Sequence, residues 1–161
     1  MPTDVELAMR LSAALVLGGV IGLERELTGQ VAGLRTHMMV ALGSCLFAVV
    51  SAYGFDDFVG PRADTNVQID VTRVASNIVT GVGFLGGGAI LKSGSSVRGL
   101  TTAASLWVTA AVGLAVAFGS LVLAAVTTFL LVFALTVLRT PRTWLRERFA
   151  EPESAANNSE S

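Results

Sequence analysis

Residues 100–138 read LTTAASLWVTAAVGLAVAFGSLVLAAVTTFLLVFALTVL and contain no Asp, Glu, Lys or Arg. A helix that crosses a bilayer needs about 20 predominantly apolar residues, so this stretch is long enough for two. Gly119 and Ser120 divide it, and so short a connection predicts a tight antiparallel hairpin of two helices. We place these helices at Leu100–Phe118 and Leu121–Leu138. The stretch predicts an all-α membrane protein.

The rest of the chain has a similar composition. Of its 161 residues, 52% are hydrophobic and only 14% are charged, and the mean hydropathy is +0.67. Soluble domains usually carry about 25% charged residues. Three more apolar stretches are predicted to span the membrane: Leu7–Leu23, Thr36–Tyr53 and Val74–Leu91. We therefore expect one domain, residues 1–138, that forms a bundle of five transmembrane helices.

The Lys and Arg residues predict the orientation of this bundle. Five spans place the termini on opposite sides, and basic residues concentrate on the cytoplasmic side. One side would hold Arg10, Arg62 and Arg73. The other would hold the eight remaining basic residues: Arg25, Arg35, Lys92, Arg98, Arg139, Arg142, Arg146 and Arg148. We expect a multi-pass protein with its N-terminus outside and its C-terminus in the cytoplasm.

Three segments are predicted to lie outside the spans. Residues 139–150 mix arginines with Trp144, Leu145 and Phe149, which is typical of a segment at the anionic membrane surface. Residues 151–161 are small and polar, which predicts a disordered tail. The outer loop after Tyr53 carries four aspartates but no regular ligand spacing, so we expect a solvated loop and no metal site.

Small residues four positions apart predict close helix packing, because they let two backbones approach each other. The predicted packing residues are Gly18, Gly22, Gly83, Gly87 and a stripe of Thr101, Ser105, Thr109, Gly113 and Ala117. Asn77 is expected to form a hydrogen bond between helices. The partner helices belong either to the same chain or to another subunit.

The segment from Val82 to Leu91 reads VGFLGGGAIL and is unusually rich in glycine. It fits either a closely packed helix or a broken helix whose free carbonyl groups line a cavity, as in some transporters. The packed helix is favoured, because irregular backbone at membrane depth must be sheltered by protein or line a water-filled cavity.

Nothing in the sequence predicts an enzyme. The single cysteine, Cys45, excludes an internal disulfide, and the single histidine, His37, excludes a histidine cluster. The chain has no phosphate loop, nucleophile elbow or histidine-based triad. We expect no catalytic residue, no cofactor and no binding of nucleic acid.

Three motifs together resemble the MgtC/SapB family of bacterial inner-membrane proteins. They are GLERE at 22–26 continuing to AGLRTH at 32–37, GFLG at 83–86, and VRGLTTAA at 97–104. The resemblance covers residues 7–138. It implies a five-helix domain of the inner membrane that is linked to growth at low magnesium, survival in macrophages and, in some members, acid resistance. The chain is similar to the short SapB-like form, without the soluble C-terminal domain of the virulence-associated members.

The charged residues of these motifs are predicted to meet at the cytoplasmic side. Glu24, Arg25 and Glu26 follow the first span, and Arg35 precedes the second. They form either an ion-pair clamp or a polar vestibule for a cation, a proton or a protein; Glu24 with Arg35 is the preferred pair. The vestibule would include three further residues: Lys92, Arg98 and Thr101.

Two functions remain open at this stage. The first is a non-enzymatic regulator that binds another membrane protein within the lipid bilayer through its small-residue faces; the same faces would also suit a homo-oligomer. The alternative is a small oligomeric Mg²⁺ or proton transporter, in which a broken third helix and Asp70, Arg73 and Asn77 line the outer approach.

Overall fold

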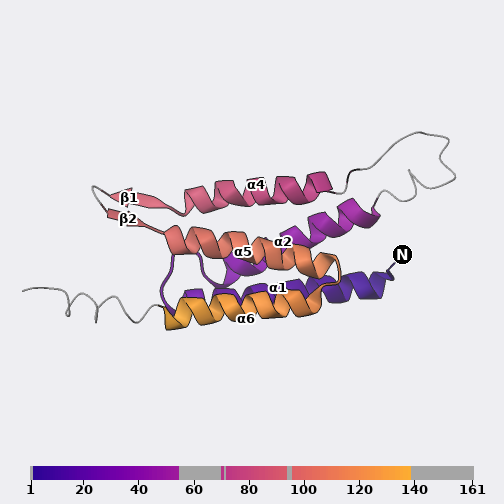
Figure 1. The fold of residues 1–161 in the computed structure, drawn as a ribbon, viewed down its shortest axis with the longest axis horizontal. Helices are drawn as coiled ribbons and strands as arrows, with labels where there is room; N and C mark the ends of the chain where they lie inside the picture. Colours follow the sequence, from indigo (N-terminus) through magenta and orange to yellow (C-terminus); the bar gives the residue numbers. More distant parts are fainter. Residues whose placement is uncertain (1, 55–69, 71, 94–95, 139–161) are drawn as a thin grey trace, which may run out of the picture.

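The computed structural model describes residues 2–54, 70, 72–93 and 96–138, and this part of the chain forms five helices and one small β-hairpin (Figure 1). In chain order the elements are α1 (Asp4–Leu27), α2 (Leu34–Tyr53), α4 (Thr72–Gly88), β1 (Leu91–Ser93), β2 (Ser96–Arg98), α5 (Leu100–Ala117) and α6 (Leu121–Val137). Each predicted span coincides with one helix to within four residues at either end. The predicted helical architecture is therefore confirmed, with the small hairpin as an addition.

Three of these helices, α1, α2 and α5, are long and apolar enough to cross a membrane. Helix α6 is also apolar but has 17 residues, and α4 has 17 residues as well. The outward side of α6 is strongly apolar, with Val122, Leu123, Phe129 and Phe133 all exposed. Side chains of this kind are stable on a surface when lipid surrounds them. The described chain is a helical membrane protein.

The interior of the bundle differs from this apolar outer surface, because small and hydroxyl-bearing residues lie between the helices. Ser105 and Thr109 of α5 are fully buried, and each hydroxyl donates a hydrogen bond to a carbonyl oxygen of its own helix. A Cβ atom on Gly113 would collide with the carbonyl oxygen of Ala41 and lie 3.1 Å from the Cβ of Ser44. Helix α5 therefore packs closely against α2.

Helix α1 makes its most extensive contacts with α2, whereas α4 lies at the edge and contacts mainly α5. A Cβ atom on Gly18 would lie 2.7 Å from the Cβ of Ala41, and one on Gly22 would lie 2.7 Å from the Cα of Leu34. These two glycines let the α1 and α2 backbones touch. A core of buried apolar residues from α1, α2, α5 and α6 fills the space between those helices.

Four residues that were predicted to pack against a helix are exposed in the described part of the chain, so their packing against another subunit stays a prediction. A Cβ atom added to Gly83 or Gly87 would have no neighbouring atom of the described residues within 4 Å, because α4 turns that face away from the bundle. Asn77 is exposed on the same helix, and Thr101 is exposed at the start of α5. The packed stripe of α5 consists of Ser105 and the small residues that follow it.

Helix α4 is continuous from Thr72 to Gly88, so the broken-helix alternative is not found. The chain then leaves the helix and forms the antiparallel β1–β2 hairpin, in which Leu91 pairs with Arg98. The predicted third span, which extended to Leu91, is therefore too long at its end.

At the other end of α4, hydrogen bonds from the Thr72 hydroxyl and backbone N–H hold the pKa of the Asp70 carboxyl below its usual value.

The predictions for the outer loop, the basic interfacial segment and the disordered tail fall on residues 55–69, 139–150 and 151–161. These segments lie outside the described residues.

Candidate functional site

The turn between α1 and α2 is organised by Glu26 and Gly33. One carboxylate oxygen of Glu26, Oε2, accepts a 2.9 Å hydrogen bond from the backbone N–H of Leu34 at the start of α2. Gly33 has no side chain to cap this helix, and a Cβ atom there would collide with the same carboxylate. Glu26 thus supplies the cap from the preceding helix and places a negative charge at the positive end of α2.

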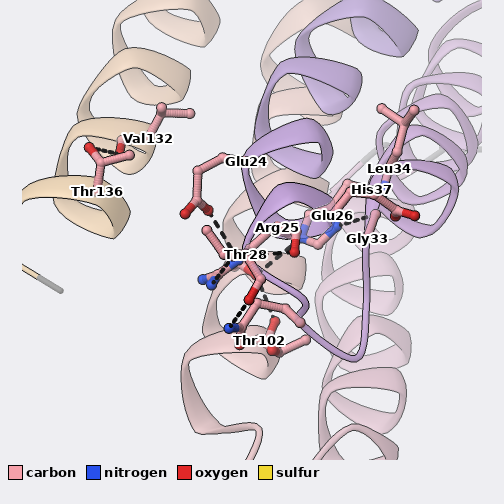
Figure 2. A network of polar contacts seen from close by, with 12 residues as sticks. Glu24, Arg25, Glu26, Thr28, Gly33, Leu34, His37, Thr102, Val132 and Thr136 are labelled. Atoms are coloured by element: carbon pink, nitrogen blue, oxygen red, sulfur yellow. Dashed lines mark hydrogen bonds and ion pairs between the residues drawn. The ribbon is translucent and has the colours of Figure 1, made fainter.

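Glu24 and Arg25 form a buried ion pair at the end of α1 (Figure 2). Their relative exposures are 9% and 3%, and Arg25 Nε lies 3.2 Å from Glu24 Oε2. The guanidinium also approaches the hydroxyl oxygen of Thr28, with Nη2 at 3.5 Å. Charged groups leave water only at a large cost unless they are paired, so this pair defines the most polar point of the interior.

The preferred pairing of Glu24 with Arg35 is wrong. Arg35 lies in the first turn of α2 with its side chain exposed, and it makes no ion pair with any described residue. Glu24 instead turns into the bundle, toward the side on which α6 lies in Figure 2. Glu24 and Arg35 are close in the sequence, so both were predicted to lie at the same turn. Whether they pair depends on which faces of α1 and α2 are in contact, and the sequence does not determine this.

Several buried side-chain oxygen atoms lack a hydrogen bond from any described residue. They are Oε1 of Glu24, Oε2 of Glu24, which has the ion-pair contact with Arg25 but no hydrogen bond of good geometry, and Oγ1 of Thr102 and of Thr128. Thr102 belongs to α5 and Thr128 to α6, so three helices contribute. Buried polar atoms usually have a partner, such as an ordered water. These oxygens can therefore accept hydrogen bonds from water inside the bundle.

His37, the last residue of the AGLRTH motif, is fully buried and is the polar centre of the α2–α5 contact. Its Nδ1 lies 2.9 Å from the carbonyl oxygen of Gly33, and its Nε2 lies 3.0 Å from the hydroxyl oxygen of Ser105. One signal was present in the sequence: His37 and Ser105 lie near the starts of two spans that enter the membrane from the same side.

The remaining predicted site residues do not join this buried group. Lys92 and Arg98 are exposed on the β-hairpin, and Thr101 is exposed at the start of α5. The hairpin and the α1–α2 turn do lie at the same end of the molecule, as Figure 1 shows. The expected vestibule is thus divided into a buried group and an exposed basic hairpin.

The opposite end of the bundle is held by Arg10, another residue whose role was missed. Its guanidinium donates a 2.6 Å hydrogen bond to the carbonyl oxygen of Ala117 and a 3.3 Å bond to the hydroxyl of Tyr53. It also forms a 2.6 Å ion pair with Glu6 on its own helix. Arg10 therefore joins α1 to the ends of α2 and α5.

A groove of about 390 Å³ lies between α2 and α4. Asn77 and Ser44 are the only residues with polar side chains among those that line it; the others are Met39, Val40, Gly43, Phe47, Val74, Ile78, Gly81 and Val82. Within the described residues no three His, Cys, Asp or Glu side chains gather as a metal site would require. The groove suits an apolar occupant.

The fold and these sites define a helical membrane protein with a buried charged group at one end. The MgtC family model matches residues 11–144, and the chain belongs to the MgtC family. No solved structure matches the chain.

Curated relatives agree with this assignment. The Escherichia coli protein named "Putative magnesium transporter YhiD" is 46% identical over 114 residues, which cover 71% of this chain and 52% of that protein. Protein MgtC of Brucella abortus is 43% identical over 129 residues, which cover 80% of this chain and 50% of that protein. The chain thus spans about half the length of these relatives.

Proposed function

We propose that this protein is a non-enzymatic, multi-pass protein of the bacterial inner membrane that regulates another membrane protein during adaptation to low magnesium or acid stress. The name of the Escherichia coli relative supports the link to magnesium. One observation carries the regulatory part of the proposal: the outward face of α4 is apolar, rich in glycine and not covered by any other described part of the chain.

The geometry of this face suits a partner helix. No atom of the described residues lies within 4 Å of a Cβ position on Gly81, Gly83 or Gly87, and Phe84 beside them is 85% exposed. A transmembrane helix that packs on such a face brings its backbone close and gains dispersion contacts. The groove between α2 and α4 extends the face and offers the amide of Asn77 as a polar contact.

The other small-residue faces are already occupied within the chain. Gly18 and Gly22 contact α2, and Gly113 contacts Ala41, so these glycines hold the bundle together. A bulky residue at Gly113 would therefore unfold the protein rather than release a partner. The small-residue face of α4 is not packed against another described helix, whereas those of α1 and α5 are. We therefore expect α4 to be the helix that binds the partner.

The alternative function, an oligomeric Mg²⁺ or proton transporter, drew its support from a broken third helix. Helix α4 is continuous, and the groove beside it is mostly apolar. The regulator is the function that the described residues favour.

The proposal is tested by site-specific photocrosslinking in native membranes. A photoreactive residue at Gly87 should give a discrete product with a second membrane protein, because this position faces outward on α4. The same residue at Val122, which is exposed on α6, serves as the control for nonspecific lipid-side contacts. Gly83→Leu should abolish the Gly87 product and impair growth at low magnesium, while the amount of folded protein stays normal.

Two outcomes would contradict the regulatory function. Products that contain only copies of this chain would indicate a homo-oligomer. Products that contain only lipid, at Gly87 as at Val122, would indicate that α4 faces the bilayer.

A further inference from the structure

His37 is the only histidine in the chain, and it has no exposed surface. Histidine is the side chain whose charge ordinarily changes between pH 5 and 8. A fully buried histidine whose two ring nitrogens both face hydrogen-bonding atoms must satisfy both of them in whichever protonation state it adopts. The contacts of these two nitrogens therefore determine which protonation states of His37 are compatible with the fold.

The first ring nitrogen has only one role. Nδ1 lies 2.9 Å from the carbonyl oxygen of Gly33, and a carbonyl oxygen only accepts hydrogen bonds. Nδ1 must therefore carry a proton in every state of the folded protein. The neutral ring is fixed as the tautomer in which Nε2 is the acceptor.

The second ring nitrogen has two roles, because Ser105 can act in two ways. Nε2 lies 3.0 Å from Ser105 Oγ, which itself lies 2.8 Å from the carbonyl oxygen of Thr102. The hydroxyl has one proton. It can donate that proton to Nε2 of the neutral ring. It can also donate to Thr102 and accept a hydrogen bond from Nε2–H of the charged ring.

These two states differ by one proton and a rotation of one hydroxyl, with the heavy atoms in place. In the charged state the imidazolium donates to Gly33 and to Ser105, and Ser105 donates to Thr102. Every donor of the ring then has an acceptor, and both bonds of the ring are charge-assisted. The structure therefore provides every hydrogen-bond acceptor that a buried, protonated histidine needs.

The charges around the ring do not exclude a positive charge. Burial by itself disfavours the charged form of a histidine, so the charge depends on the hydrogen bonds described above. The charged groups that α1 places near the ring are Glu24 and Arg25, which have opposite signs. The two are paired with each other, so their effects partly cancel. Helix α5 contains no charged residue and contacts the ring through the Ser105 hydroxyl, and Arg35 of α2 is exposed.

We propose that His37 is a proton-binding site, in which Nε2 takes a proton from the aqueous phase and Ser105 transfers its hydrogen bond from the ring to Thr102. Proton binding forms one N–H bond and links α2 to α5 through a charge-assisted hydrogen bond. The site is separate from the outward face of α4, so this inference does not depend on the proposed partner.

The single histidine makes the test direct. The full chain, labelled with ¹⁵N only in histidine, is placed in lipid nanodiscs and followed by NMR from about pH 8 to about pH 4, the range in which histidine ordinarily titrates. At the upper end we expect a protonated Nδ1 and an unprotonated Nε2. On acidification Nε2 should gain a proton in one transition while the protein remains folded.

Ser105→Ala tests the role of the hydroxyl. It leaves the Nε2–H of the charged ring without its acceptor, and a lost hydrogen bond to a charged group corresponds to a roughly tenfold fall in proton affinity, about one pH unit in the midpoint. Thr109→Val is the matched control. Thr109 is equally buried on α5 but donates to the Ser105 carbonyl, so the midpoint should not change.

Three results would overturn the proposal. The first is an Nε2-protonated neutral ring near pH 8, which contradicts the contact with Gly33. The second is a ring that stays neutral throughout the range in the folded protein. The third is a midpoint that is the same in Ser105→Ala and in the native chain. The first two need no variant, so the test holds even if Ser105→Ala does not fold.

Discussion

Glu24 and Arg25 are consecutive in the sequence, yet both side chains are buried at the end of α1 and pair with each other. Neighbouring residues on a helix point about 100° apart, so this pairing requires one long side chain to bend toward the other. Arg25 also contacts Thr28, one turn later. The pair joins α1 to the interior of the bundle and is the residue-scale feature on which the candidate site depends.

We predict that Glu24→Gln lowers the free energy of unfolding by about 3 kcal/mol, because removal of one partner leaves the other charge buried without its counter-ion. Arg25→Met should lower it by a similar amount. The double variant should lose less than the two single losses combined, since it removes both charges. Thermal unfolding in detergent, followed by size-exclusion chromatography, measures all three variants.

Arg35→Gln is the control for this prediction. Arg35 is exposed and has no ion pair with a described residue, so its loss should change stability by no more than about 0.5 kcal/mol. If Arg35→Gln destabilised the protein as much as Glu24→Gln, the Glu24–Arg25 pair would not be the clamp. Arg35, and not Arg25, would then be the ion-pair partner of Glu24.

At the scale of helices, the glycines divide into two groups that the sequence does not distinguish. Gly18 and Gly83 both begin a G-x-x-x-G pattern, yet of these two only Gly18 lies against a neighbouring helix in the part of the chain that the structure describes. We predict that Gly18→Ala destabilises the protein by about 1–3 kcal/mol, because its Cβ would meet the Ala41 Cβ and the His37 carbonyl oxygen at 2.7 Å.

Gly83→Ala is the matched change on α4. Its Cβ would enter open space, and alanine is a better helix former than glycine, so the variant should be as stable as the native chain or slightly more stable. Thermal unfolding of both variants in one detergent makes the comparison. Equal losses of stability would show that α4 is covered by an element that packs as closely as α2.

A second pair of glycines tests the connection between α4 and α5. Gly99 and Gly29 both have positive φ, at +89° and +66°, but a Cβ on Gly99 would collide with the carbonyl oxygen of Ala89, while Gly29 has open space. Both alanine variants should lose about 1–2 kcal/mol from backbone strain. Gly99→Ala should lose more, because the collision adds to the strain. Equal unfolding temperatures for the two variants would contradict the structure of this connection.

Hydropathy and length predicted all five helices, because apolar runs bounded by charges are a strong signal. The β-hairpin was missed, since its three-residue strands carry no alternating pattern and follow an apolar run without a break. The site was predicted only in outline: the motif residues Glu24 and Arg25 were identified, but their pairing depends on how α1 rotates in the bundle.

For the whole molecule, the two ends of the bundle have different polar groups. One end holds the Glu24–Arg25 pair and the basic hairpin with Lys92 and Arg98, and the other holds Arg10 with its partners on α2 and α5. Basic residues concentrate on the cytoplasmic side of membrane proteins. This asymmetry supports the proposed orientation, in which the hairpin and the buried pair face the cytoplasm and the N-terminus lies outside.

The most direct test of this account is the side of the membrane on which each end of α4 lies. Asp70, before α4, and Ser96, in the hairpin after it, are both exposed, while the single native cysteine, Cys45, is buried. In a Cys45→Ala background, an impermeant thiol reagent added to intact spheroplasts should label Asp70→Cys but not Ser96→Cys, and inside-out vesicles should show the reverse. Labelling of both positions from the same side would show that α4 does not cross the membrane, and would contradict the five-span bundle.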